Sequence, residues 1–560
     1  MAEVIYDAIV VGSGITGGWA AKELTERGLK VLMIERGPEV RHGDYPTEHQ
    51  PVYDFKYRLL GDKRRYAEDY PVQQRTFFFN EASERFFVND RDNPYTTPED
   101  KPFTWIRGHQ LGGRSLTWGR QSYRMAPLNF EENALDGHGV DWPIRYADLA
   151  PWYDHVERFI GVAAAKLNNE MSPDGVHQPP FPMNAAERDL KARFAKLLPD
   201  TPVAMARTAM LTEPLGERQP CHFCGPCQRG CSSGAYFSTQ SSTLPAAQAT
   251  GRLTVQADSI VSRILVDDNT GRATGVEIID RNTGTKRTAG GRMVFLCASA
   301  FESVRLLFLS ATPRWRTGLA NSSGALGKYV MDHHSSDLVV TTVPAKPMAH
   351  YSGYRPVPLM MPRFRNVTEK RGDYVRGYQV NGAAALQDWD RGLRMPGVGV
   401  AFKNALRKTG DWSLFLAAQG EMLPDARNRI TLDESVRDKW GMPVPHIDVT
   451  WGDNERAMQR DANETLEKML TSAGYGNVMR IPLDSPPGST IHEMGGATMG
   501  RDPKTSVLDA HNRTHDIANL FVTDGAAMAS SSSSNPSLTY MALTARAAAF
   551  AAAEFKAGRL

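Results

Sequence analysis

The sequence predicts an α/β protein with two lobes, and three features support this. A chain of 560 residues is too long for a single simple core. Near its start, an apolar run at 6–11 leads into a glycine-rich turn at 12–17 and then a helical segment to about Arg27. Further along, 428–433 and 444–450 are typical of antiparallel strands and are expected to form the substrate wall. We therefore expect a Rossmann-like nucleotide-binding lobe and a second, α+β lobe built on an antiparallel sheet.

The turn at 12–17 predicts a dinucleotide site. Gly12 permits the tight turn, Gly14 lets a pyrophosphate approach the backbone, and Gly17 lets helix and strand pack closely. A second apolar strand at 30–35 ends in Glu35, where an acid can bind the ribose hydroxyls of either NAD or FAD. The residues expected to contact the cofactor here are Gly12, Ser13, Gly14, Thr16, Gly17, Glu35 and Arg36.

Later segments favour FAD over NAD. Gly112 and Gly113 form a glycine pair where the backbone can come close to a ligand, and a strand-like run at 519–523 ends in Asp524 and Gly525. Contacts from segments so far apart suit a long, extended cofactor, whereas NAD usually needs one continuous lobe. The further residues expected to contact FAD are Arg107, Gly112, Gly113, Ser115, Ile260, Asp524, Gly525, Asn535 and Pro536.

Four of the five cysteines, Cys221, Cys224, Cys227 and Cys231, lie within eleven residues. Their C-x2-C-x2-C-x3-C spacing is typical of thiolate ligands to an iron–sulfur cluster. A structural zinc site, which usually splits its ligands into two separated pairs, is the first alternative. Two disulfides are the second, although bonds between adjacent cysteines would close very tight loops. Cys297 is expected to be a small buried residue on a strand.

The composition argues against several partners. A net charge of +2 gives no electrostatic footprint for nucleic acid or an anionic membrane. No stretch of 18 apolar residues occurs, so we expect no direct membrane span. The first residues lack the basic and apolar regions of a signal peptide, which favours a cytoplasmic enzyme.

Six segments together resemble the glucose–methanol–choline (GMC) oxidoreductases. They are 12–17, 112–115, 295–307, 326–333 and the C-terminal segments around His492 and Asn535. The resemblance covers nearly the whole chain and implies an FAD-binding lobe of the GMC and glutathione reductase type. We expect 1–40, 103–125, 215–335 and 480–560 to form the FAD-binding domain, including the 221–231 cysteine cluster, and 41–102, 126–214 and 336–479 to form the substrate-binding domain.

The family resemblance also implies the catalytic groups. His492 looks like the histidine that faces the flavin, and a neutral imidazole can take a hydroxyl proton while hydride leaves for flavin N5. Asn535 matches the second member of the family's His–His or His–Asn pair. Asn535 and Pro536 are also expected to cap and begin a helix to about Phe555, whose positive end would stabilise reduced flavin. The five serines before Asn535 are expected to form a close-packed turn rather than a flexible linker.

Within the family, the cysteine motif looks like that of iron–sulfur-containing, FAD-dependent sugar dehydrogenases, and the segments 14–24 and 118–123 look closest to bacterial glucoside 3-dehydrogenases. Thr117 stands where some relatives carry the histidine that attaches FAD, so we expect non-covalent FAD. Relatives with a three-iron cluster match three of the four cysteines. The additional Cys224 favours 4Fe–4S, with 3Fe–4S as the alternative.

These features combine into one functional prediction. We expect an FAD-dependent dehydrogenase that oxidises a secondary hydroxyl of a sugar or glycoside, at C3 of glucosides, to a ketone. Electrons would leave through the cluster to a small accessory subunit or a cytochrome, not to NAD or oxygen. Relatives pair with a signal-bearing subunit, so periplasmic co-export is the alternative location. The rival functions are an oxygen-using sugar oxidase of the same fold and a non-catalytic electron-transfer subunit.

Overall fold

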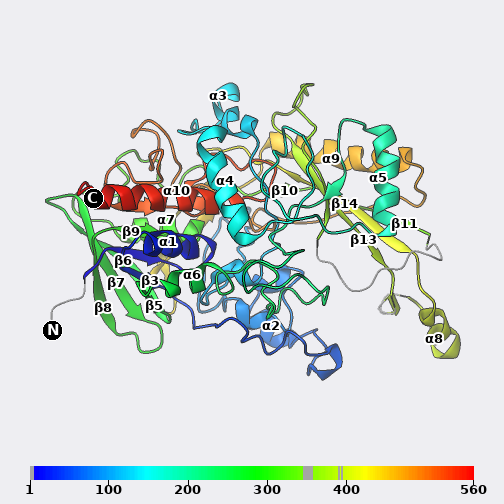
Figure 1. The fold of residues 1–560 in the computed structure, drawn as a ribbon, viewed down its shortest axis with the longest axis horizontal. Helices are drawn as coiled ribbons and strands as arrows, with labels where there is room; N and C mark the ends of the chain where they lie inside the picture. Colours follow the sequence, from blue (N-terminus) through cyan, green and yellow to red (C-terminus); the bar gives the residue numbers. More distant parts are fainter. Residues whose placement is uncertain (1–4, 345–356, 389–390, 393–394) are drawn as a thin grey trace.

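The computed structural model describes residues 5–344, 357–388, 391–392 and 395–560. Its first sheet is parallel, with strand order β18-β9-β2-β3-β5. The strands are β2 (Ala8–Val11), β3 (Val31–Ile34), β5 (Leu253–Gln256), β9 (Val294–Leu296) and β18 (Leu520–Val522). The parallel sheet thus joins three distant parts of the chain and confirms the Rossmann-like fold (Figure 1). The domain boundaries given above stay a prediction.

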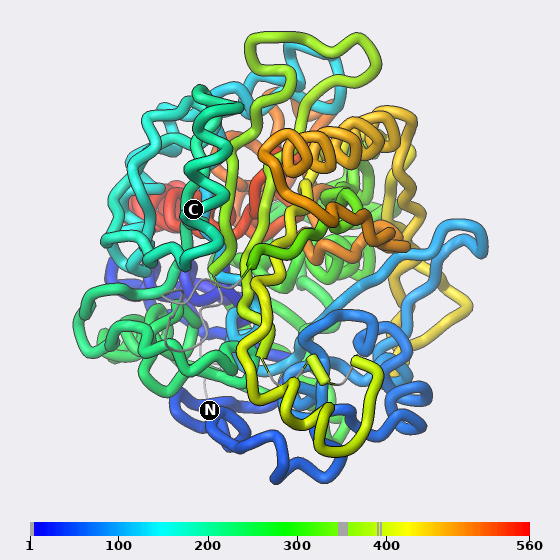
Figure 2. The backbone as a smooth tube through the Cα atoms, turned by 90° about the vertical axis from the view of Figure 1, so that its right-hand side faces the viewer, coloured from blue at the N-terminus to red at the C-terminus, as the bar shows by residue number. Residues whose placement is uncertain are grey.

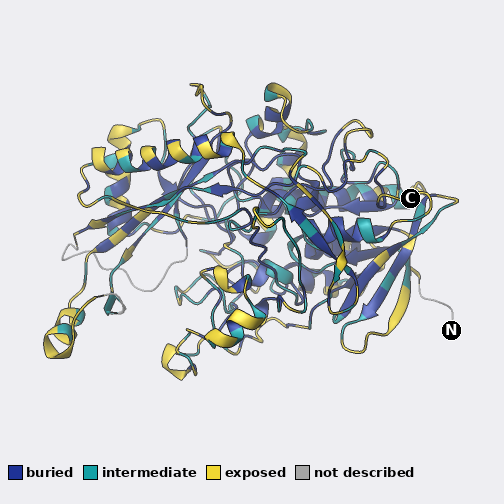
Figure 3. Cartoon of the chain, turned by 180° about the vertical axis from the view of Figure 1, so that it is seen from behind, coloured by how far each residue is buried: buried dark blue, intermediate teal, exposed yellow. Residues whose placement is uncertain are grey.

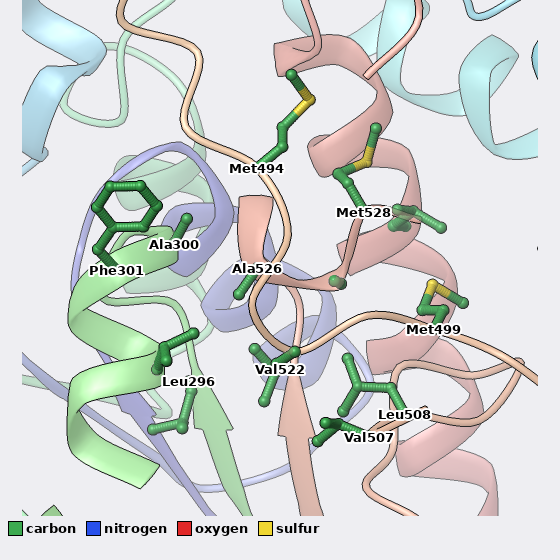
Figure 4. Packing of buried hydrophobic residues seen from close by; sticks show 14 of the residues in the cluster. Leu296, Ala300, Phe301, Met494, Met499, Val507, Leu508, Val522, Ala526 and Met528 are labelled. Atoms are coloured by element: carbon green, nitrogen blue, oxygen red, sulfur yellow. The ribbon is translucent and has the colours of Figure 1, made fainter. Parts of the chain in front are cut away.

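Helices pack closely against the parallel sheet, which explains why β2 and β3 are unbroken apolar runs. They include α1 (Ile15–Glu26), α6 (Thr243–Ala249), α7 (Ala300–Leu309) and α10 (Ser537–Lys556). α10 runs beside α1. Figure 4 shows the core next to this sheet, where Phe301 of α7, Val522 of β18 and nearby methionines, including Met494, are fully buried.

A second sheet has the order β1-β8-β7-β6 and extends the first lobe. Its strands are β1 (Ile5–Tyr6), β6 (Ser259–Asp267), β7 (Arg272–Asp280) and β8 (Lys286–Gly291). Cys297 is buried, as expected, although it directly follows β9 instead of lying on it.

The second lobe is built on a seven-stranded antiparallel sheet, as expected, with the order β17-β11-β14-β13-β12-β4 and β10 beside β14. Its strands are β4 (Ala204–Met205), β10 (His334–Ser335), β11 (Leu338–Val343), β12 (Leu359–Met361), β13 (Tyr378–Leu386), β14 (Trp412–Gly420) and β17 (Met479–Ile481). Helices α5 (Ala185–Leu197) and α9 (Asp453–Ser472) lie over this sheet and touch each other (Figures 1 and 2). The outer face of α9 is exposed and its inner face is buried (Figure 3).

β14 shows how this sheet supplies one wall of a cavity. Leu414, Leu416 and Ala418 are buried in the core of the second lobe. Phe415 and Gln419 alternate with them and line the large cavity described below. The period of two along a strand therefore separates core residues from cavity residues.

The strands predicted at 428–433 and 444–450 exist as β15 (Arg429–Arg437) and β16 (Pro443–Asp448). Their predicted place was wrong, because they pair with each other in a separate two-stranded ribbon that packs against α7 and, among the described residues, joins no strand of the large sheet. The long strands of the large sheet, β13 and β14, were not predicted.

The remaining elements connect or cover the lobes. The helices are α2 (Lys63–Asp69), α3 (Glu132–Asp136), α4 (Tyr146–Ile160) and α8 (Gly399–Arg407). Single 3-10 turns are η1 (Val52–Asp54), η2 (Gln73–Arg75), η3 (Glu84–Phe86), η4 (Gly113–Leu116), η5 (Pro127–Phe130) and η7 (Gly525–Ala527). Among the described residues, no helix is both long and apolar enough to cross a bilayer.

The expected start of the C-terminal helix is shifted by one residue. Pro536 is the N-cap and Ser537 the first helical residue of α10, so Asn535 lies outside the helix. The Asn535 side chain bonds His492 instead of capping the helix. All five preceding serines are buried, which confirms a close-packed turn.

Candidate active site

A cavity of about 1230 Å³ lies between the parallel sheet and the large antiparallel sheet. It is lined at one end by the turn after β2 and at the other by residues of β11 and β14. The predicted site residues that line it are Gly12, Ser13, Gly14, Thr16, Glu35, Arg36, Arg107, Gly113, Ser115, Ile260, His492, Asp524, Gly525, Asn535 and Pro536. Gly17 and Gly112 lie behind its wall, and the four clustered cysteines do not line it.

The three glycines of the turn have different surroundings. Gly12 has a φ of +95°, and a Cβ atom there would lie 2.4 Å from the carbonyl oxygen of Cys297. A Cβ on Gly17 would lie 2.0 Å from the Gly12 carbonyl oxygen, so helix and strand touch through these two residues. A Cβ on Gly14 would meet nothing within 4 Å and would project into open space. Gly12 and Gly17 are therefore needed for packing, whereas Gly14 leaves room at the N-terminus of α1.

Glu35 anchors the other side of the turn. Ser13 donates to the Glu35 carboxylate through its backbone N–H at 3.2 Å and its hydroxyl at 2.5 Å. The Gly37 N–H donates to the second carboxylate oxygen at 2.8 Å. Burial raises the pKa of Glu35 above its usual range. Oε2 accepts both bonds from Ser13, whereas Oε1 accepts one, so Oε1 keeps acceptor capacity and can also accept from a ribose hydroxyl.

These features fit FAD as the occupant of the cavity. The open N-terminus of α1 can hold a pyrophosphate, and Glu35 can hold a ribose. Asp524 lies further along the cavity, where Ser303 and the Ala526 N–H donate to its carboxylate. Burial raises the pKa of Asp524 to about 6. The opposite end of the cavity has room for a substrate beside His492.

His492 lies at the centre of a hydrogen-bonded row of side chains. The Asn535 amide nitrogen is 2.9 Å from His492 Nε2. On the other side of the ring, His333 Nδ1 is 3.0 Å from His492 Nδ1, and His333 Nε2 is 2.9 Å from the Ser532 carbonyl oxygen. His492 and Asn535 face the cavity, whereas His333 is fully buried behind them.

The electrostatics of this row favour uncharged imidazoles. Burial lowers the pKa of His492 well below its usual value, and the neighbouring His333 and Arg114 lower it further. Burial also lowers the pKa of His333 to about 4. Both histidines are therefore neutral near pH 7, the state in which His492 can accept a proton.

Asp332 holds the loop that carries His492. Its carboxylate accepts from the backbone N–H of His492 at 3.1 Å, from the backbone N–H of Gly488 at 2.8 Å and from the Thr490 hydroxyl. Burial raises the pKa of Asp332 to about 6. Ligand atoms of Asp332, His333 and His492 lie within 4.8 Å of one another. We interpret the group as a hydrogen-bonded support, because these donors already occupy Asp332 and the two Nδ1 atoms lie at hydrogen-bond distance.

No role was predicted for Asp332 or His333, although both belong to the 326–333 segment that resembles the family. They are about 160 positions from His492 in the chain, and contacts that include the paired backbones of Met331 and Met494 bring them together. Apart from that resemblance, the local sign of a functional position is the polar run Asp-His-His-Ser-Ser-Asp at 332–337.

The cysteine loop lies behind the cavity wall. Its four thiols are free, and so is Cys297, so no disulfide joins them. Within the described residues, no three of the loop's sulfurs lie within 4.8 Å of one another. Thiolates on one zinc ion, with Zn–S bonds of about 2.3 Å, would have to lie closer than that. The loop is thus not a preformed single-ion site, and the iron–sulfur cluster stays a prediction.

The loop nevertheless approaches the cavity through one residue. Arg120 lines the cavity, and its guanidinium donates to the Cys227 carbonyl oxygen at 3.4 Å. Burial raises the pKa of Cys227 to about 11, to which the other three thiols also contribute. The other three thiols are therefore near enough to Cys227 to act on its charge. Cys227 is buried and Cys224 is exposed, so the loop extends from beside the cavity to the surface.

The comparisons with known proteins agree with this geometry. Two models of the GMC oxidoreductase family match residues 205–335 and 424–544, and an NAD(P)-binding Rossmann-like domain matches residues 10–59. The fructose dehydrogenase large subunit of Gluconobacter japonicus is 27% identical, with 97% of each chain covered. A C-glycoside 3-oxidase of Microbacterium trichothecenolyticum is also 27% identical, but over 54% of each chain.

The fold has solved neighbours as well. The pyridoxine 4-oxidase structure from Mesorbium loti superimposes with a TM-score of 0.60 at 17% identity, covering 97% of this chain and 98% of that one. At this identity the likeness concerns the fold alone. In sequence, the two family models and the fructose dehydrogenase large subunit, which has nearly equal length, show that this chain is similar to the GMC oxidoreductases.

Proposed function

We propose that this chain is an FAD-dependent dehydrogenase that oxidises a secondary hydroxyl of a sugar or glycoside to a ketone, at C3 of glucosides. The observation that carries the proposal is the pairing of a neutral His492 with Asn535 on the cavity wall, 2.9 Å apart. The names of the relatives support a sugar substrate, since they include a fructose dehydrogenase and a C-glycoside 3-oxidase.

The proposed chemistry divides between the two cavity side chains. His492 Nε2 accepts the proton of the substrate hydroxyl, and the Asn535 amide donates to the hydroxyl oxygen and orients it. FAD, when bound, supplies the hydride acceptor. The N-terminus of α10 begins two residues after Asn535, where its dipole favours negative charge at this end of the cavity.

The pH dependence of this step follows from the environment of His492. The base must be neutral, and burial lowers the pKa of His492 below its usual value near 6.5. We therefore expect the rate of flavin reduction by methyl glucoside to stay constant as the pH falls from about 8 to about 6.5. Its acid limb should lie below that range. Anaerobic stopped-flow measurements across this range test the expectation, and a half-maximal rate above about pH 6.5 would contradict it.

The proposed electron exit is a 4Fe–4S cluster on the four cysteines, with 3Fe–4S as the alternative. The free thiols, the nearness of the other three thiols to Cys227 and the Arg120 contact beside the cavity support it. The exposed Cys224 would put one edge of the cluster at the surface, within reach of a small accessory subunit or a cytochrome. We also propose a cytoplasmic location, with periplasmic co-export alongside a signal-bearing partner as the alternative.

Metal analysis of the anaerobically purified protein tests the cluster. We expect about four iron and four sulfide per flavin in the wild type and in Cys297→Ala, which changes the one cysteine outside the loop. Cys227→Ser should lose most of the iron while keeping its flavin, because Cys227 does not line the FAD cavity. Zinc in place of iron, or equal iron in Cys227→Ser and wild type, would overturn the electron route.

The visible spectrum on addition of methyl glucoside without oxygen tests the function as a whole. Bleaching of the flavin, with a 3-keto glucoside as product, is the expected result. Fast reoxidation by oxygen alone would favour an oxidase, a rival also suggested by the C-glycoside 3-oxidase relative. A flavin that no sugar or alcohol bleaches would favour the non-catalytic electron-transfer subunit.

A further inference from the structure

We infer that His333 is a positioning residue that holds His492 in the tautomer whose Nε2 carries no hydrogen and can accept a proton. The inference rests on the proposed function for its role in catalysis, but the tautomer itself follows from contacts within the chain. The row runs from the Ser532 carbonyl through His333 and His492 to Asn535.

The first step is the contact with Ser532. Its carbonyl oxygen can only accept, so His333 Nε2, at 2.9 Å, must carry a hydrogen. In a neutral imidazole the other nitrogen is then an acceptor, which fixes His333 Nδ1 as the acceptor in this row.

The second step transfers this constraint to the catalytic ring. His333 Nδ1 and His492 Nδ1 are 3.0 Å apart, so the hydrogen between them belongs to His492. A neutral His492 protonated on Nδ1 has its lone pair on Nε2. At that nitrogen lies the Asn535 amide NH₂, a donor, at 2.9 Å. The two ends of the row therefore require the same tautomer.

His333 is itself held on both sides. The backbone N–H of His333 donates to the Thr490 hydroxyl at 3.3 Å, and the His333 ring stands at 87° to the ring of His492. The Ser532 peptide has a φ of +55°, and its N–H donates to Glu421 at 3.2 Å. Glu421 is fully buried and accepts from Arg376 at 2.7 Å. A serine with a positive φ needs support of this kind from its surroundings. The conformation directs the Ser532 carbonyl at His333.

Loss of the His333 ring would leave His492 Nδ1 without its acceptor. Both neutral tautomers would then be populated, and the one protonated on Nε2 cannot take the hydroxyl proton. We expect kcat to fall by about 10- to 100-fold, the usual effect of removing a partner that orients a reacting histidine, with KM little changed.

Three variants test the inference. His333→Leu removes the acceptor, and His333→Asn restores an amide oxygen near the position of Nδ1. His334→Leu is the matched control, since His334 is equally buried and its ring nitrogens have no hydrogen-bond partner among the described residues. The direct readout is ¹⁵N NMR of histidine-labelled, flavin-loaded protein, with the His492 signals identified by their loss in His492→Asn. Flavin content and circular dichroism check that each variant folds.

The expected result is a proton on His492 Nδ1 in wild type, His334→Leu and His333→Asn, and a mixture of tautomers in His333→Leu. The kcat should be similar in wild type, His334→Leu and His333→Asn, and lower in His333→Leu. A proton on His492 Nε2 in wild type overturns the inference, even if His333→Leu does not fold, and so does an unchanged tautomer in folded His333→Leu. If the NMR result is as expected but no sugar or alcohol bleaches the flavin, the proposed function fails and the tautomer assignment stands.

Discussion

Replacing His492 with asparagine is expected to slow flavin reduction by methyl glucoside by about 100- to 10,000-fold, the usual contribution of a general base. The shorter amide keeps a polar group at the cavity wall but cannot take a proton. His333 is buried behind His492, and the Asp332 carboxylate accepts from the backbone N–H of His492. Neither side chain can therefore reach a substrate in place of the His492 ring. Anaerobic stopped-flow measurement of flavin bleaching gives the rate directly.

The matched control is His138→Asn, because His138 is an exposed histidine that does not line the cavity. This control should reduce its flavin at the wild-type rate. Both variants should retain FAD, since the residues predicted to hold the nucleotide lie at the other end of the cavity. A His492→Asn protein that bleaches within about tenfold of the wild-type rate would show that another group removes the proton.

The sequence predicted the nucleotide end of the site well because its signals are local. The turn at 12–17, the strand before it and the helix after it are encoded within about twenty residues, and the structure has each of them. The start of α10 was predicted one residue too early because Asn535 is a favoured cap in general. In this chain its side chain has a better partner in His492.

The catalytic support was less predictable because its signals are not local. His333 becomes a neighbour of both His492 and Ser532 only when the segment just before β10, the loop before β18 and the serine turn meet. The sequence predicted that the second lobe contains an antiparallel sheet, but it did not identify the strands that form it. Residues 428–433 and 444–450 alternate like sheet strands, yet form a separate ribbon, since alternation does not specify the partner.

The cysteine motif shows the limit of spacing as evidence. The spacing identified a set of candidate ligands, and the structure brings them into one loop beside Arg120. The distances between the sulfurs depend on the path of the loop, which no motif specifies. They argue against a preformed single-ion site and leave the cluster to be tested by its iron content.

A pair of glycine variants should separate folding from flavin binding in the turn after β2. Gly17→Ala puts a methyl group 2.0 Å from the Gly12 carbonyl, so helix and strand must move apart. We expect it to lower the free energy of unfolding of the flavin-free protein by about 1–3 kcal/mol or more. Gly14→Ala meets nothing within 4 Å, and its φ of −62° suits alanine, so that free energy should change by less than about 1 kcal/mol.

Flavin affinity should respond to both changes, but for different reasons. The Gly14 methyl would project into the open space at the N-terminus of α1, where the pyrophosphate is expected, and should weaken FAD binding by about tenfold or more. Gly17→Ala should weaken FAD binding only indirectly, to the extent that it distorts the turn at 12–17. Urea unfolding of the flavin-free proteins and FAD titration followed by flavin fluorescence measure the two effects. If Gly14→Ala bound FAD as tightly as the wild type, the pyrophosphate would have to lie elsewhere, because a helix N-terminus that receives phosphate cannot also accommodate a side chain at the point of closest approach.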